Sequence, residues 1–462
     1  MPMSKEDGQA AFDAVVAEAT DFMAKRWVPG LVIGVIHGDN SYTTGIGVTN
    51  VDTKEPVKSD TLFHICSVSK TFCAMLAVQM SEQGDLDLNA RMVDLLPWFK
   101  VNDPEATSKA KVIDLFHHHA GWSGDHCFLP VPPGGSNSEK CMLQACYLPQ
   151  IVPFGQTWMY NNTSLAFAGH VLSVTGGKPY ETLIEERFIS PLGMDSTTFD
   201  YGTTPPPPGS NYAWGHPPIY AEEKIAELKP IFTPFPPTAG CAGGLVSHVH
   251  DMLKWARFQL DGKDKSGNTL ISKESRDFAY APAVEAPTGE FQGVTWFVRK
   301  YPGGVTSASH PGTYVGYRAF MQVIPEHNFG IVMMCNSDRG VEVYEHVANE
   351  MIKAFTKLEP TTAVAAGVDP AVLDPFVGLY KGNWQDFQIT KDGDNYFLTQ
   401  RSIELLTKPG VAPAPAKLET TGEGWFIVME GPNKGMLGEL LEDSSGERNY
   451  LRFSHRIFIR AK

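Results

Sequence analysis

Apolar positions near the start of the chain follow two spacings, one typical of helices and one typical of strands. Residues 9–26 repeat apolar side chains at helical spacing, which predicts an opening helix. Two apolar segments then flank the turn sequence GDN at residues 38–40, which predicts a β-hairpin. From Ser67, the segment SVSKTFCAMLAVQMSEQG contains good helix formers and stops at Gly84, so it predicts a buried helix whose first turn holds Ser67.

The middle of the chain is predicted to be mostly helical and rich in loops, with helices near residues 163–176 and 180–188. Residues 202–237 contain too much proline for regular structure, and a loop of that length often forms a wall or lid over a site. Late apolar runs predict three strands and a closing helix, in the segments GVTWFVRKY, RAFMQVI, FGIVMMCN and VEVYEHVANEMIKAFTKL.

The composition changes after the closing helix. Residues 359–374 resemble a linker, and residues 375–462 contain short strand-like pieces between Gly, Asp and Pro turns. That pattern predicts a small antiparallel sheet or barrel. We therefore expect an α+β protein with a large domain over residues 1–358, a linker and a small β domain. The chain has 462 residues, more than one core usually organises, which agrees with this division.

Composition and charge narrow the classes of function. The chain is 42% hydrophobic and 19% charged, as in an ordinary folded protein. Its net charge of -14 argues against binding to nucleic acid or to an anionic membrane, because both are bound through a surplus of Lys and Arg. No apolar run reaches the roughly 18 residues that a membrane helix needs, and the acidic start lacks the order of a secretory signal. The seven cysteines form no C-x-x-C pair, so free thiols in the reducing cytoplasm are expected.

The candidate chemistry starts with Ser67 and Lys70 in FHICSVSKTF. On a helix these residues face the same way, with Cβ atoms about 5–6 Å apart. The amine could take the serine proton if its surroundings lower its pKa. S-x-x-K occurs by chance about once or twice in such a chain, and the second copy, Ser108 to Lys111, lies in a polar stretch predicted to be solvated surface. Spacing alone explains Ser67 equally well as a capping serine.

Other segments extend this motif into a family pattern. FHICSVSKTF resembles the nucleophile motif of the serine β-lactamase and penicillin-binding protein superfamily, most closely its class C and esterase branch. IDLFHHHAGW is similar to the family segment ending in His-x-Ser-Gly, with Ala120 in place of the serine. The stretch that begins FGQTWMYNNTSLAF resembles the one carrying the Tyr-x-Asn motif, here Tyr160 and Asn162. The segment AGGLVSHVHDMLKWARFQLDG is similar to a further family block.

The third family motif belongs where SHPGTYVGYRA stands, with His310-Pro311-Gly312. The resemblance spans residues 10–355 and implies a β-lactamase-like antiparallel sheet flanked by helices, with an all-helical subdomain. The C-terminal segment resembles the small lipocalin-like β domains that are attached to some esterases and peptidases of this family.

The resemblance implies a role for each matching residue. Ser67 is expected to attack a carbonyl carbon and form an acyl-enzyme, while Lys70 and Tyr160 share the proton transfers. A neighbouring ammonium would favour the Tyr160 phenolate, and the choice of base within the pair stays open. Asn162 is expected to orient Lys70 and to contact the substrate. The backbone N–H groups of Ser67 and Thr313 would form the oxyanion hole, each contributing about 3 kcal/mol.

The third motif departs from the Lys-Thr-Gly of penicillin-binding enzymes. His310 is mostly neutral at pH 7 and Pro311 has no hydroxyl, so we expect little affinity for β-lactam carboxylates and a preference for neutral esters, lactones, amides or thioesters. Gly312 would let the substrate approach the strand closely. A structural role for His310, bridging Tyr160 to the sheet, is the alternative.

Two further groups of residues are candidates for binding. Trp214 and Tyr220 lie in the proline-rich segment and could line an apolar acyl pocket. The histidines at residues 117–119 suggest a metal site, but successive helical side chains diverge by about 100°, and the H-E-x-x-H spacing is absent. We therefore expect neither a metal nor a cofactor.

Three functions agree with these residues. The first is a serine hydrolase that cleaves an ester, lactone or amide. The second is an acyltransferase that passes an acyl group from a thioester or ester to an alcohol or amine. The third is a non-catalytic binding protein on the same scaffold, against which the complete motifs argue. The expected partner is a small-molecule acyl substrate, and the sequence leaves the formation of homo-oligomers open.

Overall fold

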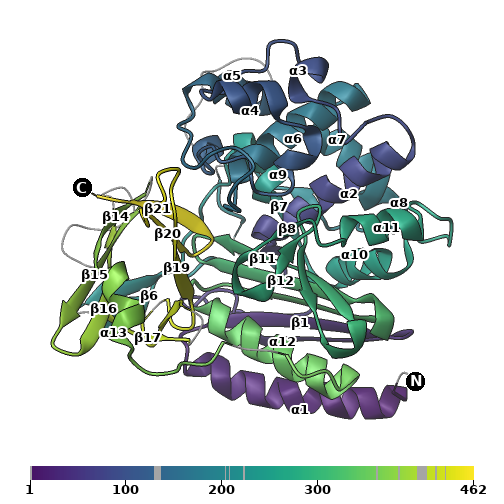
Figure 1. Ribbon diagram of the computed structural model, residues 1–462. Helices are drawn as coiled ribbons and strands as arrows, with labels where there is room; N and C mark the ends of the chain where they lie inside the picture. Colours follow the sequence, from purple (N-terminus) through teal and green to yellow (C-terminus); the bar gives the residue numbers. More distant parts are fainter. Residues whose placement is uncertain are drawn as a thin grey trace.

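The computed structural model describes residues 3–128, 137–202, 204–207, 209–221, 224–360, 363–382, 385–402, 414–421, 424–431 and 433–461. It places a large mixed domain beside a smaller β-barrel formed by the C-terminal part of the chain (Figure 1). The expected α+β class and the small antiparallel C-terminal domain are therefore confirmed. No helix in the described residues is long and apolar enough to cross a membrane.

An eight-stranded antiparallel sheet forms the centre of the large domain. Its strands, in spatial order, are β2 (Asn40–Gly47), β1 (Gly30–His37), β13 (Phe329–Cys335), β12 (Tyr317–Ile324), β11 (Thr306–Tyr314), β10 (Phe297–Lys300), β9 (Phe291–Gln292) and β8 (Val284–Glu285). Strand β1 pairs with β13 from Leu31 opposite Cys335 to His37 opposite Phe329, so the two ends of the domain meet in the sheet. The predicted hairpin and late strands are thus confirmed.

Two helices, α1 (Lys5–Ala24) and α12 (Gly340–Thr356), cover one face of this sheet (Figure 1). In α1, Phe12, Val15, Ala19 and Met23 are buried at helical spacing, and they join the buried face of α12 in one apolar core. The opening and closing helices predicted from periodicity are confirmed.

The other face of the sheet carries the nucleophile helix α2 (Ser69–Glu82) together with α10 (Val249–Asp261) and α11 (Lys273–Ala279). The rings of Phe72 and Trp255 stack with centroids 3.7 Å apart and join α2 to α10. The helical region above these helices in Figure 1 includes α3 (Met92–Leu95), α4 (Pro104–Lys109), α5 (Asn137–Leu143), α6 (Asn162–Gly176), α7 (Tyr180–Ile184) and α9 (Gly240–Gly243). Helix α7 continues as a π-helical turn (Glu185–Ile189) into α8 (Ser190–Leu192), which lies next to α10.

Short strands complete the large domain. β3 (Phe63–His64), which leads to the nucleophile, pairs with β7 (Leu245–Ser247), and β7 pairs with β4 (Thr198–Phe199). The expectation of no regular structure in residues 202–237 is wrong in one place, because β5 (Pro218–Ala221) and β6 (Lys224–Leu228) form a hairpin there. Pro218 stands at the first position of β5, where a strand tolerates proline.

After α13 (Pro370–Leu373), the C-terminal strands close into an eight-stranded antiparallel barrel. These strands are β14 (Gly378–Lys381), β15 (Gln385–Asp392), β16 (Asn395–Ser402), β17 (Ala416–Thr420), β18 (Phe426–Val428), β19 (Leu437–Leu441), β20 (Tyr450–Phe453) and β21 (Arg456–Arg460). Alternating inward residues fill the barrel with aromatic rings, among them Phe387 and Phe453 with centroids 4.9 Å apart. Ile457 of β21 is buried against Val152 and Met159 of the large domain, so the barrel is packed on that domain.

Candidate active site

The position of Ser67 follows from an unusual turn between β3 and α2. Cys66 has a φ of 50°, in the left-handed region that a non-glycine residue rarely adopts. The chain then forms a 3₁₀ turn (Cys66–Val68) that leads directly into α2. The Cys66 side chain is buried, whereas Ser67 stays partly exposed. Burial raises the pKa of the Cys66 thiol well above its ordinary value, so Ser67 is the nucleophile candidate that a substrate can reach.

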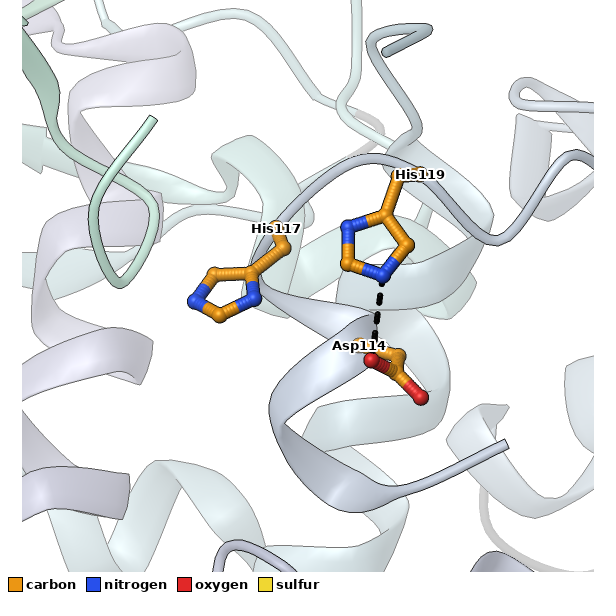
Figure 2. Close-up of side chains that lie close together, drawn as sticks. All are labelled: Asp114, His117 and His119. Atoms are coloured by element: carbon orange, nitrogen blue, oxygen red, sulfur yellow. Dashed lines mark hydrogen bonds and ion pairs between the residues drawn. The ribbon is translucent and has the colours of Figure 1, made fainter. Parts of the chain in front are cut away.

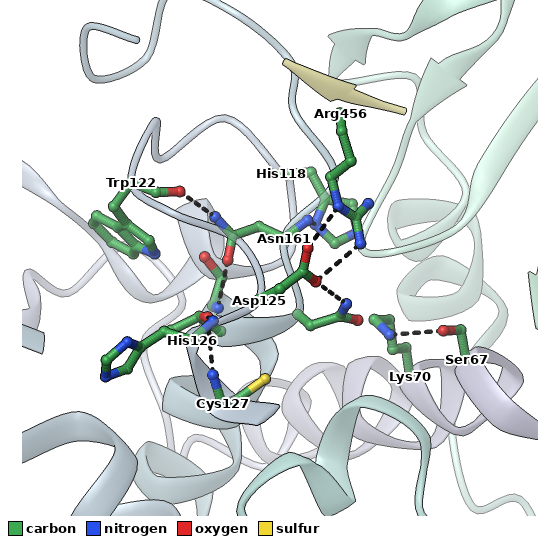
Figure 3. A network of polar contacts seen from close by, with 12 residues as sticks. Ser67, Lys70, His118, Trp122, Asp125, His126, Cys127, Asn161 and Arg456 are labelled. Carbon is green, nitrogen blue, oxygen red and sulfur yellow. Dashed lines mark hydrogen bonds and ion pairs between the residues drawn. The ribbon is translucent and has the colours of Figure 1, made fainter. Parts of the chain in front are cut away.

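Lys70 lies in the first turn of α2 and is completely buried. Its Nζ donates to the Ser67 hydroxyl at 3.0 Å (Figure 3). The same nitrogen donates to the backbone carbonyl of Ala242 at 2.5 Å. Burial lowers the pKa of this amine to about 7. A substantial fraction of Lys70 is therefore neutral at physiological pH and able to accept a proton. The predicted proximity of the two side chains is confirmed.

Tyr160 reaches the same place from the segment that precedes α6. The Nζ of Lys70 lies 5.0 Å from the centroid of the Tyr160 ring. Burial raises the pKa of the Tyr160 phenol, and a hydrogen bond with Ser67 and the nearby Arg456 offset this only in part. The expectation that a neighbouring ammonium favours the phenolate is wrong, because desolvation outweighs the charge and Tyr160 is a neutral phenol.

Asn162 is the first residue of α6, and its amide nitrogen donates to Asp125 at 2.6 Å. The guanidinium of Arg456 makes two bonds to the same carboxylate, Nε to Oδ2 at 3.0 Å and Nη2 to Oδ1 at 3.0 Å (Figure 3). Burial alone would raise the pKa of Asp125, but Arg456, Asn162 and Lys70 lower it below its ordinary value. The carboxylate is therefore ionised beside the catalytic candidates.

Asp125 and Arg456 are functional candidates that the sequence alone does not indicate. They are 331 positions apart in the chain, and Arg456 belongs to the C-terminal barrel. Neither residue lies in a segment that resembles a family motif, so the sequence holds no local signal that pairs them. The centroid of the Tyr160 ring lies 4.7 Å from the guanidinium carbon of Arg456, so the barrel takes part in the site.

Strand β11 brings the third motif against the nucleophile turn. Its pairing with β10 ends at Ser309 opposite Phe297, so Gly312 and Thr313 extend beyond that neighbour. A Cβ on Gly312 would lie 2.6 Å from the carbonyl oxygen of Ile65 and 3.1 Å from the Cβ of Cys66. Glycine is needed here so that the strand can contact the nucleophile turn. Thr313, the next residue, is exposed.

His310 is fully buried on the same strand. Its Nδ1 lies 2.6 Å from the carbonyl oxygen of Pro311 and must donate, because a carbonyl oxygen only accepts. Burial lowers the pKa of His310 to about 3, so the ring is neutral and Nε2 carries a lone pair. Within the described residues this Nε2 has no hydrogen-bond partner. It can therefore accept a bond from a substrate or from the Tyr160 hydroxyl, whose ring centroid lies 6.1 Å from that of His310.

Of the two aromatic residues proposed for an acyl pocket, Trp214 has a described side chain, and its ring contacts that of Phe232, with centroids 6.4 Å apart. The backbone N–H of Trp214 donates to the carbonyl of Thr49. The side chain of Tyr220 lies outside the described residues. Phe235 lies next to the nucleophile turn, where a Cβ on Gly243 would touch both the Phe235 ring, at 2.6 Å, and the carbonyl carbon of Cys66, at 3.5 Å.

The histidine run divides between two environments. His118 has a φ of 56° and is buried, with its ring centroid 4.5 Å from that of Tyr160. His117 and His119 lie close to Asp114, and Nε2 of His119 is 3.1 Å from Oδ1 of Asp114 (Figure 2). One ligand atom from each of Asp114, His117 and His119 lies within 4.8 Å of the others, so these three residues could hold a metal ion. The helical geometry assumed for the run is wrong, because His118 is left-handed.

All seven cysteines are free thiols, as expected, and the second S-x-x-K is surface. Ser108 is exposed and donates to the carbonyl of Glu105, and Lys111 is also exposed, beyond the end of α4. The two copies of the motif thus differ in burial and in partners, although their local spacing is the same.

The chain is similar to known proteins in sequence and in fold. The family model described as Beta-lactamase matches residues 15–353. Penicillin-binding protein 4 of Amycolatopsis lactamdurans is 23% identical over 389 residues, which cover 82% of this chain and 98% of that protein. The crystal structure of SurE with D-Leu has a TM-score of 0.71 at 21% identity and covers 98% of this chain and 100% of its own. The D-amino acid amidase of Ochrobactrum anthropi, complexed with L-phenylalanine amide, has a TM-score of 0.61 at 21% identity and covers 74% of this chain and 98% of its own.

Proposed function

Because this chain belongs to the beta-lactamase family, we propose that it is a serine hydrolase that cleaves an ester, lactone or amide through an acyl-enzyme on Ser67. One observation carries this proposal: the hydroxyl of Ser67 lies 3.0 Å from the buried amine of Lys70 and beside the phenol of Tyr160. A hydroxyl with an adjacent base of lowered pKa is the arrangement that activates a serine nucleophile.

In the acylation step, neutral Lys70 takes the proton of the Ser67 hydroxyl while Oγ attacks the carbonyl carbon of the substrate. The backbone N–H groups of Ser67 and Thr313 stabilise the resulting oxyanion. The tetrahedral intermediate collapses, and the leaving alcohol or amine receives a proton from Lys70 through the Tyr160 hydroxyl. We assign the base role to Lys70 because its pKa is lowered to about 7, whereas the pKa of Tyr160 is raised.

Deacylation repeats these transfers with water. Lys70 takes a proton from the water through the Tyr160 hydroxyl while the water oxygen attacks the acyl carbon. The bond from Oγ of Ser67 to that carbon then breaks, and the proton returns from Lys70 to Oγ. Asn162 is the first residue of α6, two positions after Tyr160, and its amide donates to Asp125. This bond holds the Asn162 side chain in the active site.

The substrate class follows from the third motif. His310 is buried and neutral where penicillin-binding enzymes carry a cationic lysine, so the site offers no side-chain charge there for a carboxylate. We therefore propose a neutral acyl substrate. Two structures of similar fold are described with D-Leu and with L-phenylalanine amide. Amides and esters of small amino acids are accordingly the first substrates to test.

Acyl transfer is the second candidate function and uses the same acyl-enzyme. The buried rings of Trp158 and Phe297 pack around Tyr160, with their centroids 5.9 Å apart. Apolar surroundings of this kind favour an organic alcohol or amine over water as the acceptor. The distinguishing measurement is product partitioning: supply an acyl thioester with and without an amine acceptor, and compare the yields of free acid and amide by mass spectrometry.

The hydrolase proposal is tested with a fluorophosphonate probe and a p-nitrophenyl ester. We expect wild type to be labelled and Ser67→Ala to lose both labelling and turnover. Ser108→Ala is the matched control, since it removes the serine of the exposed S-x-x-K and should behave as wild type. Labelling that persists in Ser67→Ala would refute Ser67 as the nucleophile, and an unlabelled wild type would favour a non-catalytic binding protein.

A further inference from the structure

The turn between the last two strands of the barrel enters the active site. Phe453 of β20 pairs with Arg456 of β21, so the connecting loop is only Ser454 and His455. Both have positive φ, 49° and 61°, as the tight turn of a twisted hairpin requires. The carbonyl of His455 accepts the backbone N–H of Tyr160 at 3.0 Å. The barrel therefore contacts the main chain of a catalytic candidate directly.

Side chains of the same hairpin extend this contact. The ring of His455 meets that of Trp158 edge-on, with centroids 5.5 Å apart. Nη1 of Arg452 donates to the carbonyl of Trp158 at 3.2 Å. Residues on both sides of Met159 are thus fixed by the barrel, and Met159 itself packs against Ile457 of β21. The barrel therefore packs along one side of the segment that carries Tyr160.

The side chain of Arg456 contacts residues of the active site itself. Its guanidinium binds both oxygens of Asp125 at 3.0 Å and lies over the Tyr160 ring. The side chains of Arg456 and Asp125 are 26% and 15% exposed, so this ion pair is largely shielded from solvent. Removing one partner of such a pair leaves the other charge uncompensated. Asp125 in turn receives the amide of Asn162, so a single contact from the barrel supports two motif residues.

The groups that face Lys70 are Asp125, Arg456, Cys66, Cys73, Cys127, His118, His310 and the neighbouring Tyr160. Burial keeps the three thiols and Tyr160 protonated and keeps both histidines neutral, because it raises the pKa of Cys66, Cys73, Cys127 and Tyr160 and lowers the pKa of the histidines. Within this group, Asp125 and Arg456 are the residues that carry charge at pH 7. Their opposite charges balance beside the amine.

We propose that Arg456 is a positioning residue of the active site, supplied by the C-terminal barrel, which holds Asp125 and the Tyr160 ring in place and cancels the carboxylate charge beside Lys70. This inference rests on the proposed function, because it assumes that Lys70 must be neutral to accept the Ser67 proton. It also gives the barrel a direct role in turnover.

From this role of Arg456 we predict the direction in which two substitutions move the acidic limb of the kcat/KM profile. Arg456→Gln leaves the Asp125 anion alone beside Lys70, which raises the pKa of the amine and moves the acidic limb of the kcat/KM profile to higher pH by about 1 unit. At pH 7 the neutral fraction of Lys70 then falls from about one half to about one tenth, roughly a fivefold loss from this cause alone. Asp125→Asn leaves the cation alone and moves the limb to lower pH. The double variant should return the limb close to that of wild type.

The experiment is the pH dependence of kcat/KM for a p-nitrophenyl ester, measured on the full chain for wild type, the two single variants, the double variant and Arg456→Lys. Arg456→Lys keeps the charge but not the two-bond contact, so we expect a normal limb and a lower kcat. Arg460→Gln is the matched control on the same strand, because the contacts of Arg460 are with the barrel itself, among them the ring of Tyr380. This variant should keep the pH profile of wild type.

The outcomes separate the two proposals. Limbs that shift in opposite directions in the single variants support the inference, since a general loss of structure would move both the same way. If Arg456→Gln does not fold, Asp125→Asn and Arg456→Lys still carry the test. An unshifted limb in Arg456→Gln or Asp125→Asn, or an unchanged kcat in Arg456→Lys, with labelling lost in Ser67→Ala, would overturn the role of Arg456 and leave the hydrolase standing. Persistent labelling of Ser67→Ala would instead overturn the proposed function.

Discussion

The amine of Lys70 lies 3.0 Å from the hydroxyl of Ser67, on a side chain that is completely buried. Burial of an ammonium costs free energy, and this cost appears as a pKa lowered to about 7. The same feature that makes the amine a base therefore makes the folded protein less stable.

The first prediction concerns the roles of Lys70 and Tyr160. We expect kcat/KM for a neutral ester to rise with pH through about 7, as the buried Lys70 amine loses its proton. Tyr160→Phe should lower kcat by about 10²–10⁴-fold, the usual contribution of a proton-transfer group, and leave that limb in place. Stopped-flow or plate-based rate measurements between pH 5 and pH 9 check both. If the limb disappears in Tyr160→Phe, the titrating group is the phenol of Tyr160 and not the amine of Lys70.

The second prediction is a gain in stability on loss of function. In the unfolded chain Lys70 is protonated up to pH about 10, whereas the folded chain releases that proton near 7. Between these values the unfolded state binds more protons, so the cost of burying Lys70 is fully present below about 7 and fades as the pH rises towards 10.

Lys70→Met should therefore raise the free energy of unfolding at pH 7 by about 1–3 kcal/mol, a gain smaller than the full linkage value because two hydrogen bonds are lost. The gain should shrink at pH 9. Thermal and urea unfolding at both pH values measure it, with activity lost throughout. Met substitution that destabilises the protein equally at both pH values would contradict this account.

The third prediction concerns Gly312. A methyl group there would lie 2.6 Å from the carbonyl oxygen of Ile65, so Gly312→Ala should push β11 away from the nucleophile turn. We expect a loss of about 1–3 kcal/mol of stability, typical of overpacking, together with at least tenfold lower kcat. Gly330→Ala on β13 is the control, because its Cβ would meet the Cβ of Ala256 at an ordinary 3.4 Å. Equal effects in the two variants would argue against a special approach at Gly312.

The fourth prediction concerns substrates. The buried His310 ring is neutral above pH about 3, so it provides no cation for a β-lactam carboxylate at any working pH. We expect p-nitrophenyl esters to be hydrolysed and a fluorescent penicillin to label Ser67 at least tenfold more slowly than a neutral fluorophosphonate. Competition labelling read by gel fluorescence compares the two. Rapid penicillin labelling would show that another cation binds the carboxylate.

Much of the site could be predicted because its chemistry is local in the chain. Ser67 and Lys70 are one turn apart, and a single helix fixes their proximity. The order of motifs and the alternation of apolar residues likewise indicated the central sheet and both covering helices. The proline-rich segment gave no such indication of β5 and β6, since propensity there opposed a pairing that only the surrounding fold supports.

The features that set the reactivity of these groups are not local. Whether Tyr160 is a phenol or a phenolate depends on how completely the fold removes water from its ring. The contact of Trp214 with Phe232 likewise depends on the path of a loop that no spacing encodes.

The sequence by itself determined which groups can react, because residue identity and short-range spacing survive in any conformation. Only the tertiary structure decided their charge states and brought Arg456 to Asp125 across 331 positions, since desolvation and long-range pairing exist only once the chain has folded.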